Sequence, residues 1–151
     1  MPKASVKRLI ECKKDQLIDL VLDIEKYPEF VPFCLGSHVY EKNIKGDKTF
    51  IIADLTIGKG PFKDTYKSDV QFNNKTNTIK VTNIGGPLRH LENNWKFIES
   101  DNGTEILFDI DFEIENKFLN IVMTKSFQYG LNKIADAFQK RAQDLYQPII
   151  K

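Results

Sequence analysis

Few side chains in this chain of 151 residues could do chemistry, and the first of them are Cys34 and His38. A thiolate beside an imidazole can act as a nucleophilic pair, and both groups are zinc ligands. No third partner accompanies this pair in the sequence, and the chain holds only 2 cysteines and 2 histidines. We therefore expect no metal centre and no catalytic residue, and we expect Cys34 to behave as a small apolar side chain.

The second candidate for chemistry is a run of carboxylates at every second position, Asp109, Asp111, Glu113 and Glu115. Two paired carboxylates can serve as general acid and general base. These four alternate with apolar residues from Ile106 to Ile114, which is the pattern of a strand with one buried and one solvated face. The pattern therefore favours a solvated outer face whose carboxylates pair with lysines.

A third candidate is Asn93, which shares one strand face with Leu91, Trp95 and Phe97, while His90 lies on the other face. An amide without partners is expensive to bury on such an apolar face. Two roles are open for Asn93. It either bonds a carbonyl group of a bound ligand or satisfies a neighbouring backbone group.

Composition narrows the class of protein. The 22 Lys and Arg residues balance 21 Asp and Glu residues, so the basic surplus of a general DNA-binding protein is absent. Apolar residues make up 41% and charged residues 28%, as in ordinary globular domains. Aromatic residues reach 11%, which indicates either a large core or a lined cavity.

The N-terminal part alternates between strand and helix patterns. Residues Ser5–Cys12 are typical of a strand, and a helix begins at Lys13–Asp15, with Asp15 as the expected N-cap. Pro28 and Pro32 cannot both lie inside one regular helix, because each removes an N–H donor and clashes with the preceding turn. We therefore expect short, broken helical turns around these prolines.

The middle of the chain, from His38 to Glu115, has a period of two and is divided by turn signals into about six strands, most of them joined by hairpins. The last segment, Lys117 to Tyr146, is predicted to be one long helix. Its apolar stripe comprises Phe127, Leu131, Ile134, Phe138, Ala142 and Leu145. Gly130 inside this helix indicates either close packing or flexing there.

Together these elements predict an α+β fold in which a curved antiparallel sheet buries its apolar face against the long helix. The proline-broken segment around Pro28 and Pro32 is a poor lid for that face. Part of the apolar face would then be covered by neither helix, which gives a physical route to an internal cavity.

Three blocks in the right order resemble a known family and span nearly the whole chain. They are Tyr27-Pro28-Glu29-Phe30-Val31-Pro32-Phe33-Cys34, then Gly85-Gly86-Pro87-Leu88-Arg89-His90-Leu91-Glu92-Asn93-Asn94-Trp95-Lys96-Phe97, then Ala137-Phe138-Gln139-Lys140-Arg141-Ala142. The chain resembles the coenzyme Q-binding START-like family of the polyketide cyclase/dehydrase and lipid-transport superfamily. That family also includes bacterial ribosome association toxins. Phe33 stands where many members have Trp, which keeps the aromatic bulk and loses the indole donor.

The resemblance implies a single helix-grip domain over residues 1–151, with about seven strands, two short N-terminal helices and an internal apolar cavity. It implies that the chain binds ubiquinone or a related isoprenoid lipid and carries it in support of respiratory electron transport, without chemical conversion. No cofactor is implied beyond this ligand. An alternative role is that of a ribosome-binding inhibitor of subunit association. The third possible function is that of a cyclase or dehydratase enzyme of the superfamily.

The predicted ligand-binding residues are apolar and aromatic side chains expected to face the cavity, together with Asn93. They are Tyr27, Phe30, Val31, Phe33, Tyr66, Leu91, Asn93, Trp95, Phe108, Phe112, Phe127 and Leu131. Simple core packing is the competing explanation for each aromatic residue.

The start of the long helix is apolar nearly all round, and Lys117 and Lys125 flank it. One hypothesis is a membrane-touching gate, and the alternative is burial against the N-terminal helices. The gate residues would be Phe118, Leu119, Ile121 and Val122. We expect a cytoplasmic monomer that, on the first hypothesis, contacts the inner membrane peripherally.

Overall fold

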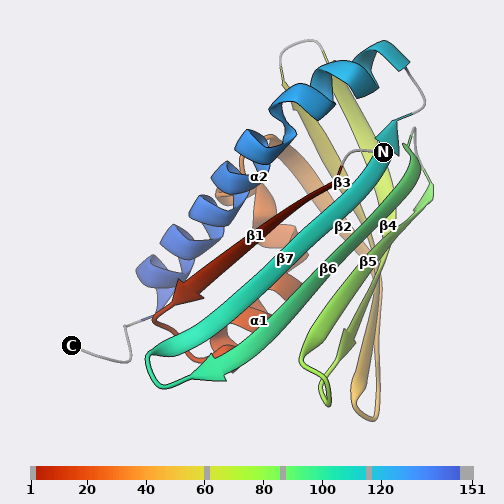
Figure 1. Cartoon of the computed structure of the whole chain (residues 1–151). Coiled ribbons are helices and arrows are strands. Elements are labelled where there is room, and N and C mark those ends of the chain that lie inside the picture. Colours follow the sequence, from red (N-terminus) through yellow and green to blue (C-terminus); the bar gives the residue numbers. More distant parts are fainter. Residues whose placement is uncertain (1–2, 60–61, 86–87, 115–116, 147–151) are drawn as a thin grey trace.

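The structure is a computed structural model that describes residues 3–59, 62–85, 88–114 and 117–146. The side chains of residues 59, 62, 85, 88–89, 112, 114 and 117–127 lie outside this description. Figure 1 shows a strongly curved sheet with the helix α2 (Lys117–Leu145) running along it beside β1. The short helix α1 (Lys14–Leu22) lies at one end, beside the hairpin tips.

The described residues form a seven-stranded sheet with the order β1-β7-β6-β5-β4-β3-β2. Every pair of neighbouring strands is antiparallel. The strands are β1 (Lys3–Ile10), β2 (Cys34–Lys45), β3 (Lys48–Lys59), β4 (Phe62–Asn73), β5 (Thr78–Gly85), β6 (Leu88–Ser100) and β7 (Gly103–Ile114). This confirms the predicted α+β class and the expected run of six strands after the N-terminal segment.

Short turns at residues 46–47, 74–77 and 101–102 join β2 to β3, β4 to β5 and β6 to β7, where the sequence places its turn residues. Gly46 (φ 62°) and Asn77 (φ 56°) adopt the left-handed conformation that hairpin turns require. Gly103 has φ 142°, and a Cβ added there would lie 2.2 Å from the carbonyl oxygen of Ile10. Only glycine therefore fits where the turn into β7 meets the end of β1.

Helix α1 begins one residue before the predicted N-cap. Lys13 is the N-cap, and its backbone N–H donates to the side-chain oxygen of Gln16 at 3.0 Å. The prediction of Asp15 as the cap is therefore wrong, because Asp15 lies inside the first turn of the helix. Its carboxylate still lies at the positive end of the helix dipole.

The proline-bearing segment is broken, as expected. A short 3₁₀ helix, η1 (Ile24–Glu29), contains Pro28, and the chain then bends into β2. Phe33 has φ 69°, a conformation that non-glycine residues seldom adopt. Its carbonyl oxygen accepts the Gly58 N–H at 2.9 Å, which fastens the bend to β3.

Helix α2 buries the C-terminal part of its predicted stripe. Leu131, Phe138 and Ala142 are buried, and Ile134 is partly buried. Leu145 is 51% exposed, so its assignment to the stripe is wrong, because the helix ends there beyond the packed face. Among the described residues, no helix combines the length and hydropathy needed to span a bilayer.

Candidate functional site

The concave face of the sheet packs closely against the helices in the region next to α1, apart from the pocket at the hairpin tips that is described below. The apolar residues there belong to one buried cluster and include Phe97, which is 2% exposed. We call this region the packed half. It comprises Ile51, Ala53, Val70, Ile79, Trp95, Phe97, Ile106 and Phe108.

Burial falls along the same strands toward the other end of the concave face. On β3, Ile51 is 1% exposed, Leu55 is partly buried, and Ile57 is 39% exposed. Strand β7 shows the same trend from Ile106 to the partly buried Ile110. We call this region the open half. It comprises Leu55, Ile57, Tyr66, Val81, Leu91 and Ile110.

Two of the predicted ligand-binding residues, Tyr66 and Leu91, lie in the open half. Burial raises the pKa of the Tyr66 hydroxyl, and the carboxylate of Asp64 adds to this shift. Tyr66 is therefore a neutral hydroxyl at neutral pH. The Leu91 backbone N–H donates to the side-chain oxygen of Asn83 at 2.8 Å, which brings a polar group from β5 to this end of the face.

Trp95, Phe108 and Leu131 lie instead inside the packed half or against it. The Trp95 ring centroid lies 4.1 Å from that of Phe108 and 5.3 Å from that of Phe138 on α2. Trp95 is 6%, Phe108 7% and Leu131 2% exposed. In this structure these side chains pack against one another, so their role in ligand binding stays a prediction.

The aromatic residues of the broken segment pack against helix α2. The rings of Tyr27 and Phe30 pack edge-on against Phe138, with centroid distances of 5.4 and 5.1 Å. The Tyr27 hydroxyl donates to the Val21 carbonyl, and burial raises its pKa. Val31 is partly buried against the same cluster. These residues join the bend after η1 to α2.

A salt bridge also joins η1 to α2. Arg141 of α2 donates to the Glu29 carboxylate at 2.8 Å, and its guanidinium lies 5.1 Å from the centre of the Phe30 ring. The hydrogen bond from Arg141, with a further contribution from Lys26, lowers the pKa of Glu29.

Asn93 fulfils the second of its two expected roles. Its Nδ2 donates to the Asp109 carbonyl of the neighbouring strand at 2.7 Å. Its Oδ1 accepts the indole N–H of Trp95 at 2.9 Å. Asn93 is 9% exposed, so these bonds compensate a nearly complete burial and fix the Trp95 ring.

Six predicted side chains fall outside the described side chains, and no contact can be assigned to them. They are Phe112 and Phe127 of the ligand-binding set and the four gate residues Phe118, Leu119, Ile121 and Val122. The gate and its alternative both stay predictions.

The residues first considered for chemistry differ in their exposure. Cys34 is 8% exposed, and burial raises the pKa of its thiol. The His38 side chain is 61% exposed, and its Nδ1 lies 4.0 Å from Glu25. Among the described residues, no three His, Cys, Asp or Glu side chains are grouped so that they could hold a metal ion.

The carboxylates of β7 occupy the expected outer face. Asp111 lies 3.8 Å from the Lys3 ammonium and 3.7 Å from His90 Nε2, and Asp109 is exposed. The Lys3 contact confirms the expected lysine partner for Asp111, but the Asp111 side chain is only 22% exposed and its Oδ1 is buried, so this position is not fully solvated. Glu115 is outside the described residues.

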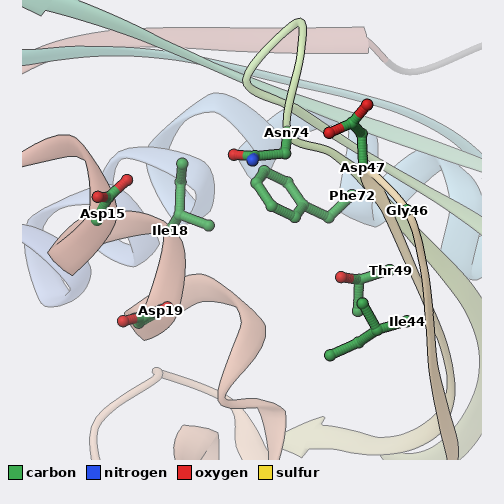
Figure 2. A pocket seen from close by; sticks show the side chains of 9 residues that line it. All are labelled: Asp15, Ile18, Asp19, Ile44, Gly46, Asp47, Thr49, Phe72 and Asn74. Carbon is green, nitrogen blue, oxygen red and sulfur yellow. The ribbon is translucent and has the colours of Figure 1, made fainter.

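Sequence reasoning missed a pocket at the α1 end of the molecule. Figure 2 shows this pocket, which has a volume of about 350 Å³, between α1 and the tips of two hairpins. It is lined by Asp15, Ile18, Asp19, Ile44, Gly46, Asp47, Thr49, Phe72 and Asn74. None of the predicted ligand-binding residues lines it. Its walls come from three distant stretches of chain, so no local motif could have indicated it.

A family model described as polyketide cyclase / dehydrase and lipid transport matches residues 10–139. The chain belongs to this family. The match spans most of the sheet and α2, so it covers both halves of the concave face, and it confirms the START-like resemblance carried by the three sequence blocks.

Two family relatives differ in what their names say they do. A "Ribosome association toxin RatA" of Rickettsia prowazekii is 30% identical over 142 residues, which cover 91% of this chain and 94% of the relative. A mitochondrial "Coenzyme Q-binding protein COQ10" of Dictyostelium discoideum is 30% identical over 135 residues, which cover 87% of this chain and 64% of the relative.

A solved structure confirms the fold. A START superfamily protein from Mycobacterium smegmatis superposes with a TM-score of 0.79 at 17% identity, covering 95% of this chain and 99% of its own. The curved seven-stranded sheet and the C-terminal helix thus form the helix-grip arrangement of this family.

Proposed function

We propose that this chain binds ubiquinone or a related isoprenoid lipid against the open half of the concave face and carries it without chemical conversion. The observation that carries the proposal is the loss of burial from Ile51 to Ile57 on one strand face. A globular protein that leaves apolar side chains exposed inside its own fold has surface suited to an apolar ligand.

The composition of the open half suits an isoprenoid chain. Its five aliphatic side chains would remove apolar area from water when a lipid lies on them, at about 25 cal/mol per Å². Tyr66 supplies a neutral hydroxyl that can donate to a carbonyl oxygen such as that of a quinone. The COQ10 relative, whose name states coenzyme Q binding, supports the choice of ligand.

The described titratable groups of the open half support carriage rather than catalysis. Tyr66 is the titratable side chain among the six open-half residues, and it stays protonated; Asp64, which pairs with Ile57 between β3 and β4, is exposed at the end of the face. General acid–base work needs an acid and a base that both reach the reacting atom. Recovery of the ligand chemically unchanged, checked by mass spectrometry of an organic extract, would separate a carrier from a cyclase or dehydratase.

The test uses two isoleucines with the same exposure on opposite faces of the sheet. Ile57, on the concave face, and Ile98, on the outer face, are both 39% exposed. We expect Ile57→Gln to weaken ubiquinone uptake from vesicles about tenfold, because a buried apolar contact is replaced by an amide. Ile98→Gln should leave uptake unchanged.

Equal uptake by both variants and the wild type would contradict binding at the open half. Failure of the wild-type chain to take up any isoprenoid quinone would contradict the proposed ligand. Circular dichroism and thermal unfolding of both variants show whether either change acts through stability instead.

A second candidate function is ribosome association with inhibition of subunit joining. The whole-length match to the RatA relative favours it, because that match covers 94% of the relative. Adding the protein to separated ribosomal subunits should then reduce the formation of whole ribosomes. Unchanged formation of whole ribosomes would remove this candidate.

The two candidates predict different locations. A quinone carrier must reach a membrane to load and unload, which would take the predicted gate at Phe118, Leu119, Ile121 and Val122 to the lipid surface. Unchanged vesicle binding after Phe118 and Leu119 are made polar would remove the gate, whereas the ribosome-bound role needs no such contact.

A further inference from the structure

Three hydroxyl-bearing side chains cross the concave face where the packed half meets the open half. Ser37 on β2 pairs with Leu55 on β3, and Leu55 pairs with Tyr66 on β4. Directly paired residues of antiparallel strands point to the same face of a sheet, so all three side chains lie on the concave face. Ser68 follows Tyr66 on that face and pairs with Ala53 of the packed half. We call Ser37, Tyr66 and Ser68 the hydroxyl band.

Ser37 carries a polar group that the fold itself does not use. Its Oγ is buried and has no hydrogen-bond partner among the described residues. Two of its neighbours on the concave face are apolar, Val39 along β2 and Leu55 across the strand pair. A buried hydroxyl without a partner costs the folded protein free energy, so its presence calls for an explanation. A ligand that accepts a hydrogen bond from Ser37 provides one.

Tyr66 offers a second donor on the other side of Leu55. Burial raises the pKa of its hydroxyl, and the charge of Asp64 adds to this shift, so the group keeps its proton. Two strand spacings separate Ser37 from Tyr66, which is about 10 Å between their backbones. A flat ring placed over Leu55 would therefore have one hydroxyl on each side.

The charges around this face favour a neutral ligand. None of the residues that define the hydroxyl band and the open half is Lys, Arg or His. Asp64 is exposed and pairs with Ile57 at the far end of the same face, so the charge placed there is negative. A phosphate or carboxylate head group would pass this carboxylate and meet no compensating cation in the hydroxyl band. A neutral head group with carbonyl oxygens meets neither cost.

We propose that the ligand of the open half enters head first, with a neutral, carbonyl-bearing ring at the hydroxyl band. The Ser37 and Tyr66 hydroxyls would each donate to a carbonyl oxygen, one on either side of the ring. The isoprenoid tail would run past Ile57, toward the end of β3 that lies farthest from the pocket beside α1. The two hydroxyls thereby select a quinone over an isoprenoid lipid with an anionic head.

Head-first binding rests on the proposed function, because it requires the ligand to lie in the open half. The orientation and the two donors can still fail alone. Ubiquinone bound tail first, or bound without help from Ser37 and Tyr66, would satisfy the proposed function and contradict the head-first arrangement.

Equilibrium binding of a short-chain ubiquinone and of geranyl phosphate tests the choice of head group. We expect the wild type to bind the ubiquinone at least about tenfold more tightly, because geranyl phosphate brings an isoprenoid tail with an anionic head. Ser37→Ala and Tyr66→Phe should each weaken ubiquinone binding about fivefold, the value of one neutral hydrogen bond. Equal affinity of the wild type for the two ligands would overturn the selection against anionic heads.

The stability of the unliganded protein separates this role of Ser37 from a structural one. Ser37→Ala should leave the thermal unfolding midpoint without ligand unchanged or raised, because the lost hydroxyl has no partner in the fold. A lowered midpoint would show that Ser37 acts through the fold and would overturn its assignment as a donor. The matched control is Ser5→Ala, which removes a hydroxyl from an exposed position on β1. It should change neither the midpoint nor the affinity for ubiquinone.

NMR contacts between ubiquinone protons and protein methyl groups measure the orientation. The methoxy protons of the ring should contact Val39 and Ala53, which pair with each other on the packed side of the hydroxyl band. The last isoprene unit should contact Ile57. The reverse set of contacts, or full ubiquinone affinity in both Ser37→Ala and Tyr66→Phe, would overturn head-first binding and leave the proposed function standing. No ubiquinone binding by the wild type would overturn both.

Discussion

The two halves of the concave face are built from the same strands with the same alternation, yet the side chains of one are buried and those of the other are only partly buried or exposed. In the packed half, Trp95 and Phe108 meet Phe138 of α2 in one aromatic cluster. In the open half, Ile57 remains 39% exposed on the same face. Alternation therefore decides which way a side chain points, whereas the covering elements decide whether it is buried.

The covering elements explain the difference between the halves. Helix α1 contributes Leu17, Ile18, Leu20 and Val21 to the core at the packed end. Asn93, near the boundary, uses its amide to hold Trp95 against the packed side. The packed half thus supplies stability, and the open half supplies apolar surface.

The largest expected difference comes from truncating one apolar side chain in each half. Phe97→Ala should lower the free energy of unfolding by about 3–5 kcal/mol, because Phe97 is fully enclosed and leaves a cavity. Leu91→Ala in the open half should cost about 1 kcal/mol, because Leu91 is partly solvated already. Urea unfolding of both variants measures the difference, and equal losses would erase the distinction between the halves.

Removing the Asn93 amide, at the boundary between the two halves, should have the next largest effect on stability. Asn93→Leu leaves the Asp109 carbonyl and the Trp95 indole N–H without their partner, at a cost of about 1–3 kcal/mol. Trp95 is the chain's only tryptophan, so its fluorescence reports directly on the loss of this bond. An unchanged emission spectrum together with unchanged stability would show that the amide does not hold the ring.

Gly130 tests whether α2 is packed or open at that point. A Cβ added at Gly130 would meet no described atom of another element within 4 Å. Of the two explanations given by the sequence, close packing against another described element is therefore excluded. Gly130→Ala should raise the free energy of unfolding by about 0.5–1 kcal/mol through helix propensity alone. A thermal unfolding midpoint lower than that of the wild type would contradict open space.

Asp19 gives the smallest effect, and that effect depends on pH. The pKa of the Asp19 carboxyl is raised in the folded protein, so ionisation of this group lowers the free energy of unfolding. The full loss of stability is reached only at pH values above the raised pKa. Asp19→Asn should therefore be more stable than the wild type at pH 7 by about 0.2–0.5 kcal/mol, the size of a like-charge pair on a helix. The advantage should vanish as the pH falls below the ordinary aspartate value near 3.8. Urea unfolding at pH 7 and pH 3 measures it, and an equal advantage at both would contradict this origin.

Local patterns in the sequence predict the elements well. The period-two run from Ile106 to Ile114 predicts β7, and Pro28 and Pro32 predict the broken segment, since strand alternation and proline geometry are local properties. The N-cap of α1 was misassigned at Asp15, because the cap depends on which backbone N–H is free and Gln16 reaches back to Lys13.

The burial gradient could not be predicted from the sequence, because Ile51 and Ile57 have the same residue type and the same parity on β3. Only the placement of α1 and α2 over the sheet distinguishes them. The pocket was missed for the same reason. Asp19, Asp47 and Phe72 become neighbours only after the hairpins fold back toward α1.

Methyl NMR during titration with a short-chain ubiquinone in detergent tests the central claim most directly. The account predicts that the methyl signals of Leu55, Ile57, Val81 and Ile110 in the open half shift and show contacts to the isoprenoid chain. The methyl signals of Ile51, Ile79 and Ile106 in the packed half should stay in place. Shifts spread equally over both halves, or confined to residues of the outer face such as Ile98, would contradict the claim that the open half is the ligand site.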